Sequence, residues 1–173
     1  MQALEFWKEV ILDKSRFLES FIEALNTAGT RYCVIGGQAV NAYVEPLVSL
    51  DLDIVVAVDQ LSDVVAGLAN LYEIKTFPHS LNLSQAGSDL RVQIQTDHRY
   101  DDFVERAAIR NVLGLALPVA SLEDVLAGKL WAVQDPARRG SKRQKDLADI
   151  ARILESYPHL RSQVPQDILS RID

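Results

Sequence analysis

The sequence predicts an α+β fold, in which a mixed β-sheet is flanked by helices and followed by a helical C-terminal part. Short apolar or alternating runs, which are typical of strands, are concentrated between residues 32 and 119. Segments with apolar residues at three- and four-residue steps, which are typical of helices, precede this region and dominate the chain after it. A sheet core followed by helices is the α+β arrangement.

The length of 173 residues, with 48% hydrophobic residues, suits one globular domain with a core of its own. We therefore expect a single domain over residues 1–173. Its parts are an N-terminal helix (1–29), a sheet core that carries the functional site (30–119) and a helical C-terminal part (120–173).

The N-terminal region predicts a long helix and a first strand. Apolar residues between positions 3 and 27 form a stripe along a helix, with room for a bend near Asp13 and a stop at Gly29. The continuous apolar run 32–35 is typical of a short buried strand. It contains Cys33, the single cysteine of the chain, which we interpret as a small core residue.

The middle of the chain predicts strands and short helices. Pro46 ends a short helix over 38–45, because the residue before a proline avoids the helical conformation. The apolar run 52–58 is a second strand with one acid inside it, and Asp59 can cap a helix over 60–69. The remaining elements expected here are strands over 71–76, 80–84 and 89–96 and a short helix over 100–107.

The last third predicts helices after one extended segment. Residues 115–119 are extended, and Pro118 places them at a sheet edge or in a crossing to the next unit. Ser121 and Asp124 have the form of a capping box, which opens a helix to about residue 133. The other helices expected are one over 142–156 and short ones beginning at Pro158 and Pro165.

Composition excludes several classes of protein. A net charge of −6 disfavours broad electrostatic capture of nucleic acid, although residues 138–145 contain five cations in eight positions. One cysteine excludes an internal disulfide and a structural zinc site built from several cysteines. The N-terminus is not typical of a signal peptide, and no apolar run reaches the length of a membrane span. We expect a cytoplasmic protein with no membrane contact.

The most informative feature is a glycine pair followed by an aspartate pair. Gly36 and Gly37 end the first strand, and a spacer of thirteen residues separates them from Asp51 and Asp53 at the start of the second. Residues two apart on a strand share a face, so the two carboxylates leave the strand on the same side. Two anions held close together resist ionising, and a divalent cation such as Mg²⁺ relieves that conflict. Glycine lets a phosphate approach the backbone amides closely.

The apolar-Gly-Gly motif and the Asp-Leu-Asp-Ile motif together resemble the hallmark of the DNA polymerase beta-like nucleotidyltransferase superfamily. Downstream, residues 121–125, Lys129, Lys145-Asp146 and Asp149 resemble the small bacterial branch that includes AbiEii-type toxins and antibiotic nucleotidyltransferases. The resemblance covers residues 30–155. It implies a nucleotidyltransferase-like mixed sheet that binds a nucleoside triphosphate.

The resemblance also implies a role for each matching residue. Asp51 and Asp53 would bind Mg²⁺ or Mn²⁺, and Gly36, Gly37 and Ser49 would hold the triphosphate. Lys129 and Lys145 would reach phosphates or the acceptor, and Asp146 would orient a lysine or the acceptor. The alternative is a solvated helix charge for each of the two lysines, and a helical surface pair for Asp146 and Asp149.

Two positions depart from the family pattern. Gln93 stands where a third acid is expected, and glutamine cannot act as a general base at neutral pH. Strand parity places Asp89, Gln95 and Asp97 on the same face as Gln93. Asp89 or Asp97 is therefore a candidate replacement for the third acid. The arginine that often precedes the aspartate pair is absent, because residues 46–48 are Pro-Leu-Val.

Two functions follow from these residues. The first is transfer of a nucleoside monophosphate from a nucleoside triphosphate to a hydroxyl of a small molecule, an RNA or a protein. The second, motivated by Gln93, is a catalytically impaired module that binds a nucleotide or a partner protein as a toxin–antitoxin component.

Overall fold

The computed structural model describes residues 3–10 and 16–173, and its centre is a seven-stranded mixed sheet. The strand order is β3-β4-β5-β2-β1-β7-β6. The α+β fold predicted from the sequence is confirmed. The strands are β1 (Tyr32–Ile35), β2 (Asp51–Val56), β3 (Glu73–Phe77), β4 (Ser80–Ser84), β5 (Arg91–Gln95), β6 (Ala108–Val112) and β7 (Leu115–Val119).

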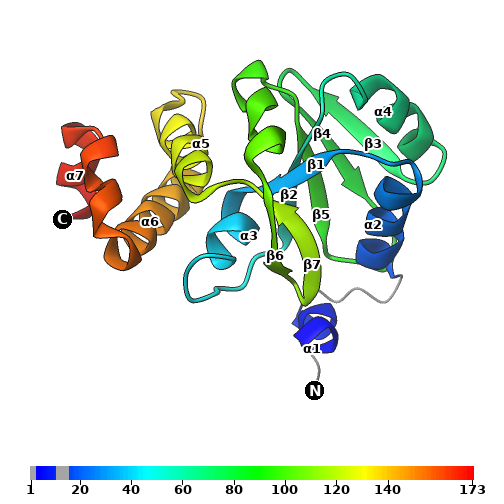
Figure 1. The fold of residues 1–173 in the computed structure, drawn as a ribbon, viewed down its shortest axis with the longest axis horizontal. Coiled ribbons are helices and arrows are strands. Elements are labelled where there is room, and N and C mark those ends of the chain that lie inside the picture. The colour runs from blue at the N-terminus through cyan, green and yellow to red at the C-terminus, as the bar shows by residue number, and fades with distance from the viewer. Residues whose placement is uncertain (1–2, 11–15) are drawn as a thin grey trace.

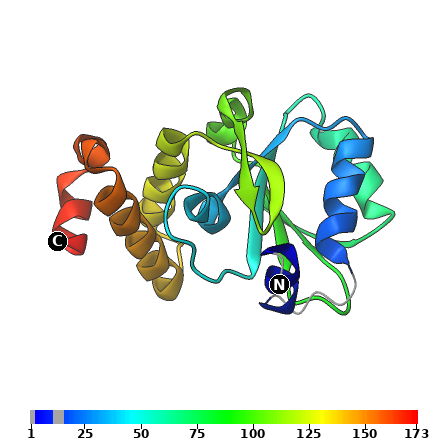
Figure 2. The ribbon, with the colours of Figure 1, turned by 60° about the horizontal axis from the view of Figure 1, so that its bottom comes forward.

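The helices divide between two ends of this sheet. Figures 1 and 2 show α2 and α4 together beside the β3–β5 part, whereas α5, α6 and α7 lie at the opposite end of the molecule. The helices are α1 (Ala3–Val10), α2 (Phe17–Thr27), α3 (Gly36–Asn41), α4 (Leu61–Ala69), α5 (Leu122–Gln134), α6 (Gly140–Ser156) and α7 (Gln166–Ile172), with 3₁₀ helices η1 (His98–Arg106) and η2 (Pro158–Gln163).

Strand β2 has two chemically different faces. Leu52 and Ile54 are fully buried, whereas Asp51 and Asp53 on the other face are partly exposed. The strand pairs with β1 in antiparallel fashion and with β5 in parallel fashion. The period-2 alternation of a strand therefore places both carboxylates on one side of the middle of the sheet.

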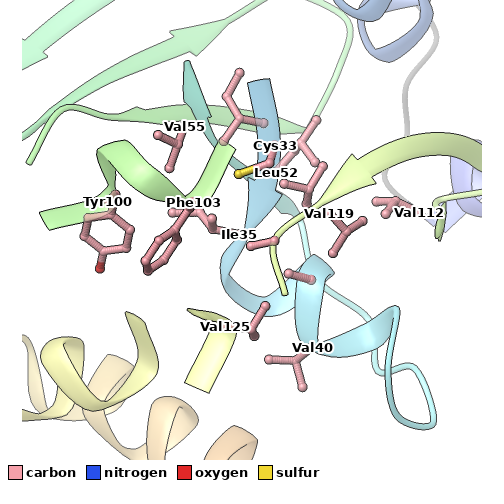
Figure 3. Close-up of a cluster of buried hydrophobic side chains, with 14 of the residues drawn as sticks. Cys33, Ile35, Val40, Leu52, Val55, Tyr100, Phe103, Val112, Val119 and Val125 are labelled. Atoms are coloured by element: carbon pink, nitrogen blue, oxygen red, sulfur yellow. The ribbon is translucent and has the colours of Figure 1, made fainter. Parts of the chain in front are cut away.

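The core extends from the sheet to the neighbouring helices. Cys33 is fully buried in β1, which confirms its interpretation as a core residue. Figure 3 shows Val40 of α3 and Val125 of α5 near the ends of β1 and β7, and Tyr100 and Phe103 of η1 side by side. This packing joins α3, α5 and η1 to the sheet that carries the two aspartates.

The structure corrects several element predictions. Of the segment 3–27, the described residues form the helices α1 and α2, and the bend predicted near Asp13 lies outside the described residues. Asp59 does not cap α4; it receives two hydrogen bonds of 2.7 and 2.8 Å from Arg31, and the position before α4 is Gln60. Electrostatic pairing with a cation therefore takes precedence over capping at Asp59.

The sheet also continues beyond the strand predicted to be its edge. Residues 108–112 form β6, which the sequence did not indicate because four of its five side chains are exposed and no apolar alternation marks it. Strand β7 consequently lies between β1 and β6, with Pro118 opposite Ile109. The prediction that Pro118 marks an edge strand is wrong.

The predicted start of α5 is confirmed, although only half of the capping box forms. The amide of Asp124 donates to Ser121 Oγ at 3.2 Å. The carboxylate of Asp124 does not return the bond, because it receives two hydrogen bonds from Arg106 instead. The helices predicted over 142–156 and from Pro158 and Pro165 are present as α6, η2 and α7.

Candidate functional site

All the site residues predicted from the sequence line one pocket of about 200 Å³. The pocket lies on the aspartate-bearing side of β2 and is closed by residues of η1, α5 and the start of α6. Among its lining residues are Gly36, Gly37, Ser49, Asp51, Asp53, Gln93, Lys129, Lys145 and Asp146. These residues come from five separate stretches of sequence, and their roles stay predictions.

The backbone of Gly36 lies close to the carboxylate of Asp53. Ile35, the last residue of β1, pairs in register with Asp53, so the turn after β1 lies directly over that side chain. Gly36 has φ of +68°, and a Cβ built there would collide with Oδ2 of Asp53. Both the backbone conformation and the available space therefore require glycine.

Gly37 is under a weaker constraint. A Cβ built there would lie 3.7 Å from Ser49 Oγ, which is ordinary van der Waals contact. Ser49 is buried, its carbonyl accepts a 3.0 Å hydrogen bond from Gln38 Nε2, and its hydroxyl accepts from the Asp51 amide at 3.4 Å. Ser49 thus helps to place the start of β2 beneath the glycine turn.

Side chains of α3 and α6 hold the loop between α3 and β2. The amide side chain of Asn41 makes two hydrogen bonds with the backbone of Leu47, at 2.7 and 3.0 Å. Arg152 of α6 donates to Asn41 Oδ1 at 3.2 Å and also to the carbonyl of Glu45. The segment that leads into Ser49 and Asp51 is therefore fixed at both ends.

The carboxylate pair has an amide beside it on the neighbouring strand. Asp53 is in register with Gln93 of β5, and both line the pocket. Burial, followed by the negative charge of Asp51, raises the pKa of Asp53 to about 6. Asp53 is thus a carboxylate that resists ionisation, and it lies between a second carboxylate and a backbone with no room for a side chain. Two carboxylates in this arrangement form a donor set that fits a hard divalent cation.

Neither acid proposed as a replacement for Gln93 joins the pair. Asp97 lines the pocket, but its carboxylate is held by Arg99 at 2.9 Å, and that interaction lowers its pKa. Asp89 lies outside the pocket lining. In the described part of the chain, no group of three or more His, Cys, Asp or Glu side chains is placed to hold a metal ion.

A buried ion-pair network forms part of the pocket wall. Lys129 Nζ lies 3.0 Å from Asp146 Oδ1 and 2.8 Å from Asp149 Oδ2, and all three residues are less than 9% exposed. Burial opposes the charge on Lys129, but the carboxylates of Asp149 and Asp146 outweigh it and raise the pKa of the lysine. The alternative of a solvated lysine and a surface acid pair is therefore wrong for these residues; Lys145, in contrast, is exposed.

The sequence did not single out three cations that pair with carboxylates of the site; Arg138 and Lys142 line the pocket, whereas Arg91 reaches Asp51 from outside its lining. Arg91 Nε lies 2.7 Å from Asp51 Oδ1, and Lys142 Nζ lies 3.4 Å from Asp51 Oδ2. Arg138 donates two hydrogen bonds to Asp146, at 2.8 and 3.1 Å. Two of the three belong to the basic segment 138–145, whose charge density was the available signal.

An aromatic cluster forms the wall of the pocket near η1. Tyr100 packs edge-on against Phe103 and Trp131, with ring centroids 5.1 Å apart in each pair. The guanidinium of Arg99 lies 4.8 Å from the centre of the Trp131 ring. A Cβ at Gly128 would lie 3.2 Å from Tyr100, so the close packing of α5 on this wall requires a small residue.

Comparison with solved structures identifies the fold. The antibiotic-resistance factor ANT(2'')-Ia is similar with a TM-score of 0.57 at 10% identity, over 89% of this chain and 93% of that one. A lincomycin-bound lincosamide antibiotic adenylyltransferase, LnuA, has a TM-score of 0.54 at 16% identity, over 81% and 98%. An antigenic nucleotidyltransferase-like protein from Paracoccidioides brasiliensis has a TM-score of 0.52 at 17% identity, over 92% and 87%. The fold is that of a nucleotidyltransferase.

The family is shown by the sequence as well. The model of the family described as nucleotidyl transferase AbiEii toxin, type IV toxin–antitoxin system, matches residues 13–171. The chain belongs to this family, as its motifs predicted. No curated protein sequence matches the chain. No helix within residues 3–10 and 16–173 is long and apolar enough to cross a membrane.

The glycine turn yields a matched pair of variants. Gly36→Ala combines a positive φ with a collision against Asp53, so we expect the free energy of unfolding to fall by about 2 kcal/mol or more. Gly37→Ala should change it by less than about 1 kcal/mol, because the added methyl has room in a helix. Urea unfolding followed by tryptophan fluorescence measures both, and equal effects of the two variants would contradict the assigned contact.

Proposed function

We propose that the protein transfers a nucleoside monophosphate from a nucleoside triphosphate to a hydroxyl acceptor, with release of pyrophosphate and with Mg²⁺ or Mn²⁺ as cofactor. The observation that carries the proposal is the contact between Gly36 and Asp53 inside the pocket that Asp51 also lines. Membership of a nucleotidyl transferase family supports it.

Asp51 and Asp53 are the proposed metal ligands. They lie on one face of β2 and line one pocket, and burial, followed by the negative charge of Asp51, raises the pKa of Asp53. A divalent cation bound there would supply positive charge for the triphosphate oxygens and for the attacking hydroxyl. The carboxylate of Asp53 lies close against the backbone of Gly36, so we expect the fold to present it as a preorganised anionic group.

The glycine turn and the exposed lysine are the proposed phosphate-binding groups. At Gly36 and Gly37 no side chain separates the pocket from the backbone, so phosphate oxygens can approach the main-chain amides. Lys145 is exposed at the pocket and can carry its charge to a phosphate or an acceptor. Ser49 acts on this surface mainly by holding the start of β2.

Lys129 and Asp146 have a positioning role in this proposal. The ammonium group of Lys129 is already held by two carboxylates, and Asp146 also receives Arg138. Lys129 is buried close enough to lower the pKa of Asp53, in opposition to the effect of burial. It therefore contributes a fixed positive charge near the carboxylate pair, and Asp146 orients it.

The second candidate function is a catalytically impaired module that binds a nucleotide or a partner protein. Its supporting observation is Gln93, which is in register with Asp53 where a third acid would stand. A glutamine oxygen can contact a metal but cannot accept a proton from the attacking hydroxyl. In a family of toxin–antitoxin systems, the partner protein proposed for this case is an antitoxin.

The acceptor is proposed only as a hydroxyl-bearing small molecule, RNA or protein. Two of the proteins with similar folds are an antibiotic-resistance factor and a lincosamide antibiotic adenylyltransferase. The pocket of this chain combines cations with an aromatic wall and carboxylates that already have cationic partners. A screen for the acceptor therefore has to include small molecules, RNAs and proteins.

Labelled nucleotides test the first function. Purified protein incubated with each α-³²P-labelled nucleoside triphosphate, Mg²⁺ and a mixture of cellular RNA, proteins and small hydroxyl compounds should release pyrophosphate and label an acceptor. The double variant Asp51→Asn/Asp53→Asn should lose at least about a hundredfold in rate. Asp59→Asn, which removes a surface acid paired with Arg31, is the matched control and should keep full activity. Transfer that survives the double variant would rule out the proposed site.

Substitution of Gln93 separates the two functions. If the amide limits proton transfer, Gln93→Glu should raise the rate constant for transfer by about a hundredfold, because a positioned general base contributes that much. Gln93→Ala, the control, should not. Single-turnover measurements of labelled product report the chemical step directly, and an unchanged rate in Gln93→Glu would show that Gln93 does not limit transfer.

A further inference from the structure

The carboxylate of Asp51 is held between two cations from distant parts of the chain. Arg91 of β5 lies 2.7 Å from one oxygen, and Lys142 of α6 lies 3.4 Å from the other. Arg91 is also the residue opposite Asp51 in the β2–β5 register. Among the described residues, no lysine or arginine forms such a pair with Asp53, beside which the backbone of Gly36 leaves no room for a side chain.

These two cations differ from the buried lysine of the site. The side chains of Arg91 and Lys142 are 64% and 42% exposed, whereas that of Lys129 is 9% exposed and is held by two buried carboxylates. Exposed ion pairs are weak and their long side chains are free to move. Arg91 and Lys142 can therefore leave Asp51, whereas Lys129 is fixed.

A metal ion at Asp51 competes with both cations. A carboxylate flanked by two positive charges is a poor site for a bare divalent cation, because the metal must displace them and is repelled by them. A triphosphate changes this balance, because its oxygens offer Arg91 and Lys142 new anionic partners as the metal takes Asp51. Arginine and lysine are both well suited to phosphate.

We propose that Arg91 and Lys142 are exchangeable phosphate ligands. Without nucleotide they neutralise Asp51; when metal and triphosphate enter together, they move to the phosphates. The metal and the triphosphate consequently bind with positive cooperativity. Each raises the affinity of the protein for the other by the same factor. The inference rests on the proposed function in one respect, the assignment of the metal to Asp51.

The proposal predicts effects of opposite sign for two ligands. In Arg91→Gln and in Lys142→Gln, Mn²⁺ alone should bind about fivefold more tightly, since one competing cation is gone. Inorganic tripolyphosphate at saturating Mn²⁺ should bind about tenfold more weakly, since one phosphate ligand is gone. A residue with only a structural role would move both affinities in the same direction.

The experiment measures both affinities on the full chain. Electron paramagnetic resonance of free Mn²⁺ reports binding of the metal alone, and calorimetry reports binding of Mn²⁺–tripolyphosphate, a probe that needs no knowledge of the base. Lys75→Gln is the control, because it removes an exposed strand cation paired with Glu73 outside the pocket. Arg91→Lys and Lys142→Arg keep the charge and should keep most of the coupling.

The outcomes distinguish the inference from the function beneath it. Opposite shifts in both variants, with none in Lys75→Gln, support the exchange. Shifts of the same sign, or none, while the wild-type protein binds both probes, overturn the exchange and leave the proposed function standing. If the wild-type protein binds neither probe, both fail. Thermal unfolding of each variant shows whether a loss of binding reflects loss of fold.

Discussion

The site depends on the close contact between the backbone at Gly36 and the carboxylate of Asp53. Strand β1 ends in register with Asp53, and the positive φ of the next residue turns the chain over that side chain. No residue other than glycine combines that conformation with that lack of space. The contact places one carboxylate directly beside the backbone of the glycine turn, and thereby brings the glycine turn and the aspartate pair together in one surface, the proposed metal site.

The charges around this surface fall into two groups with different mobility. Lys129 is buried and fixed by carboxylates of α6, so its charge is a permanent part of the site. Arg91 and Lys142 are exposed and pair with Asp51, so their charges are available for exchange. Helix α6 contributes to both groups, and its Arg152 also ties down the loop before Ser49. Helices α5 and α6 are therefore part of the site.

Local sequence patterns predicted much of this arrangement, and long-range packing explains the remainder. The glycine pair and the alternation around Asp51 and Asp53 predicted where the candidate site lies. Each of these two patterns spans only a few neighbouring residues and can therefore be recognised in the sequence. The pairing of Asp51 with Arg91 depends on the register of β5 on β2, and its pairing with Lys142 depends on how α6 docks. Strand β6 was not predicted, because an exposed edge strand does not need apolar side chains at alternate positions.

The most direct test of this account is anomalous diffraction from crystals grown with Mn²⁺ and an α,β-methylene nucleoside triphosphate. The account predicts a manganese peak in contact with the carboxylates of both Asp51 and Asp53, and a triphosphate lying against Gly36 and Gly37. A manganese peak elsewhere, or a triphosphate bound outside this pocket, would contradict it.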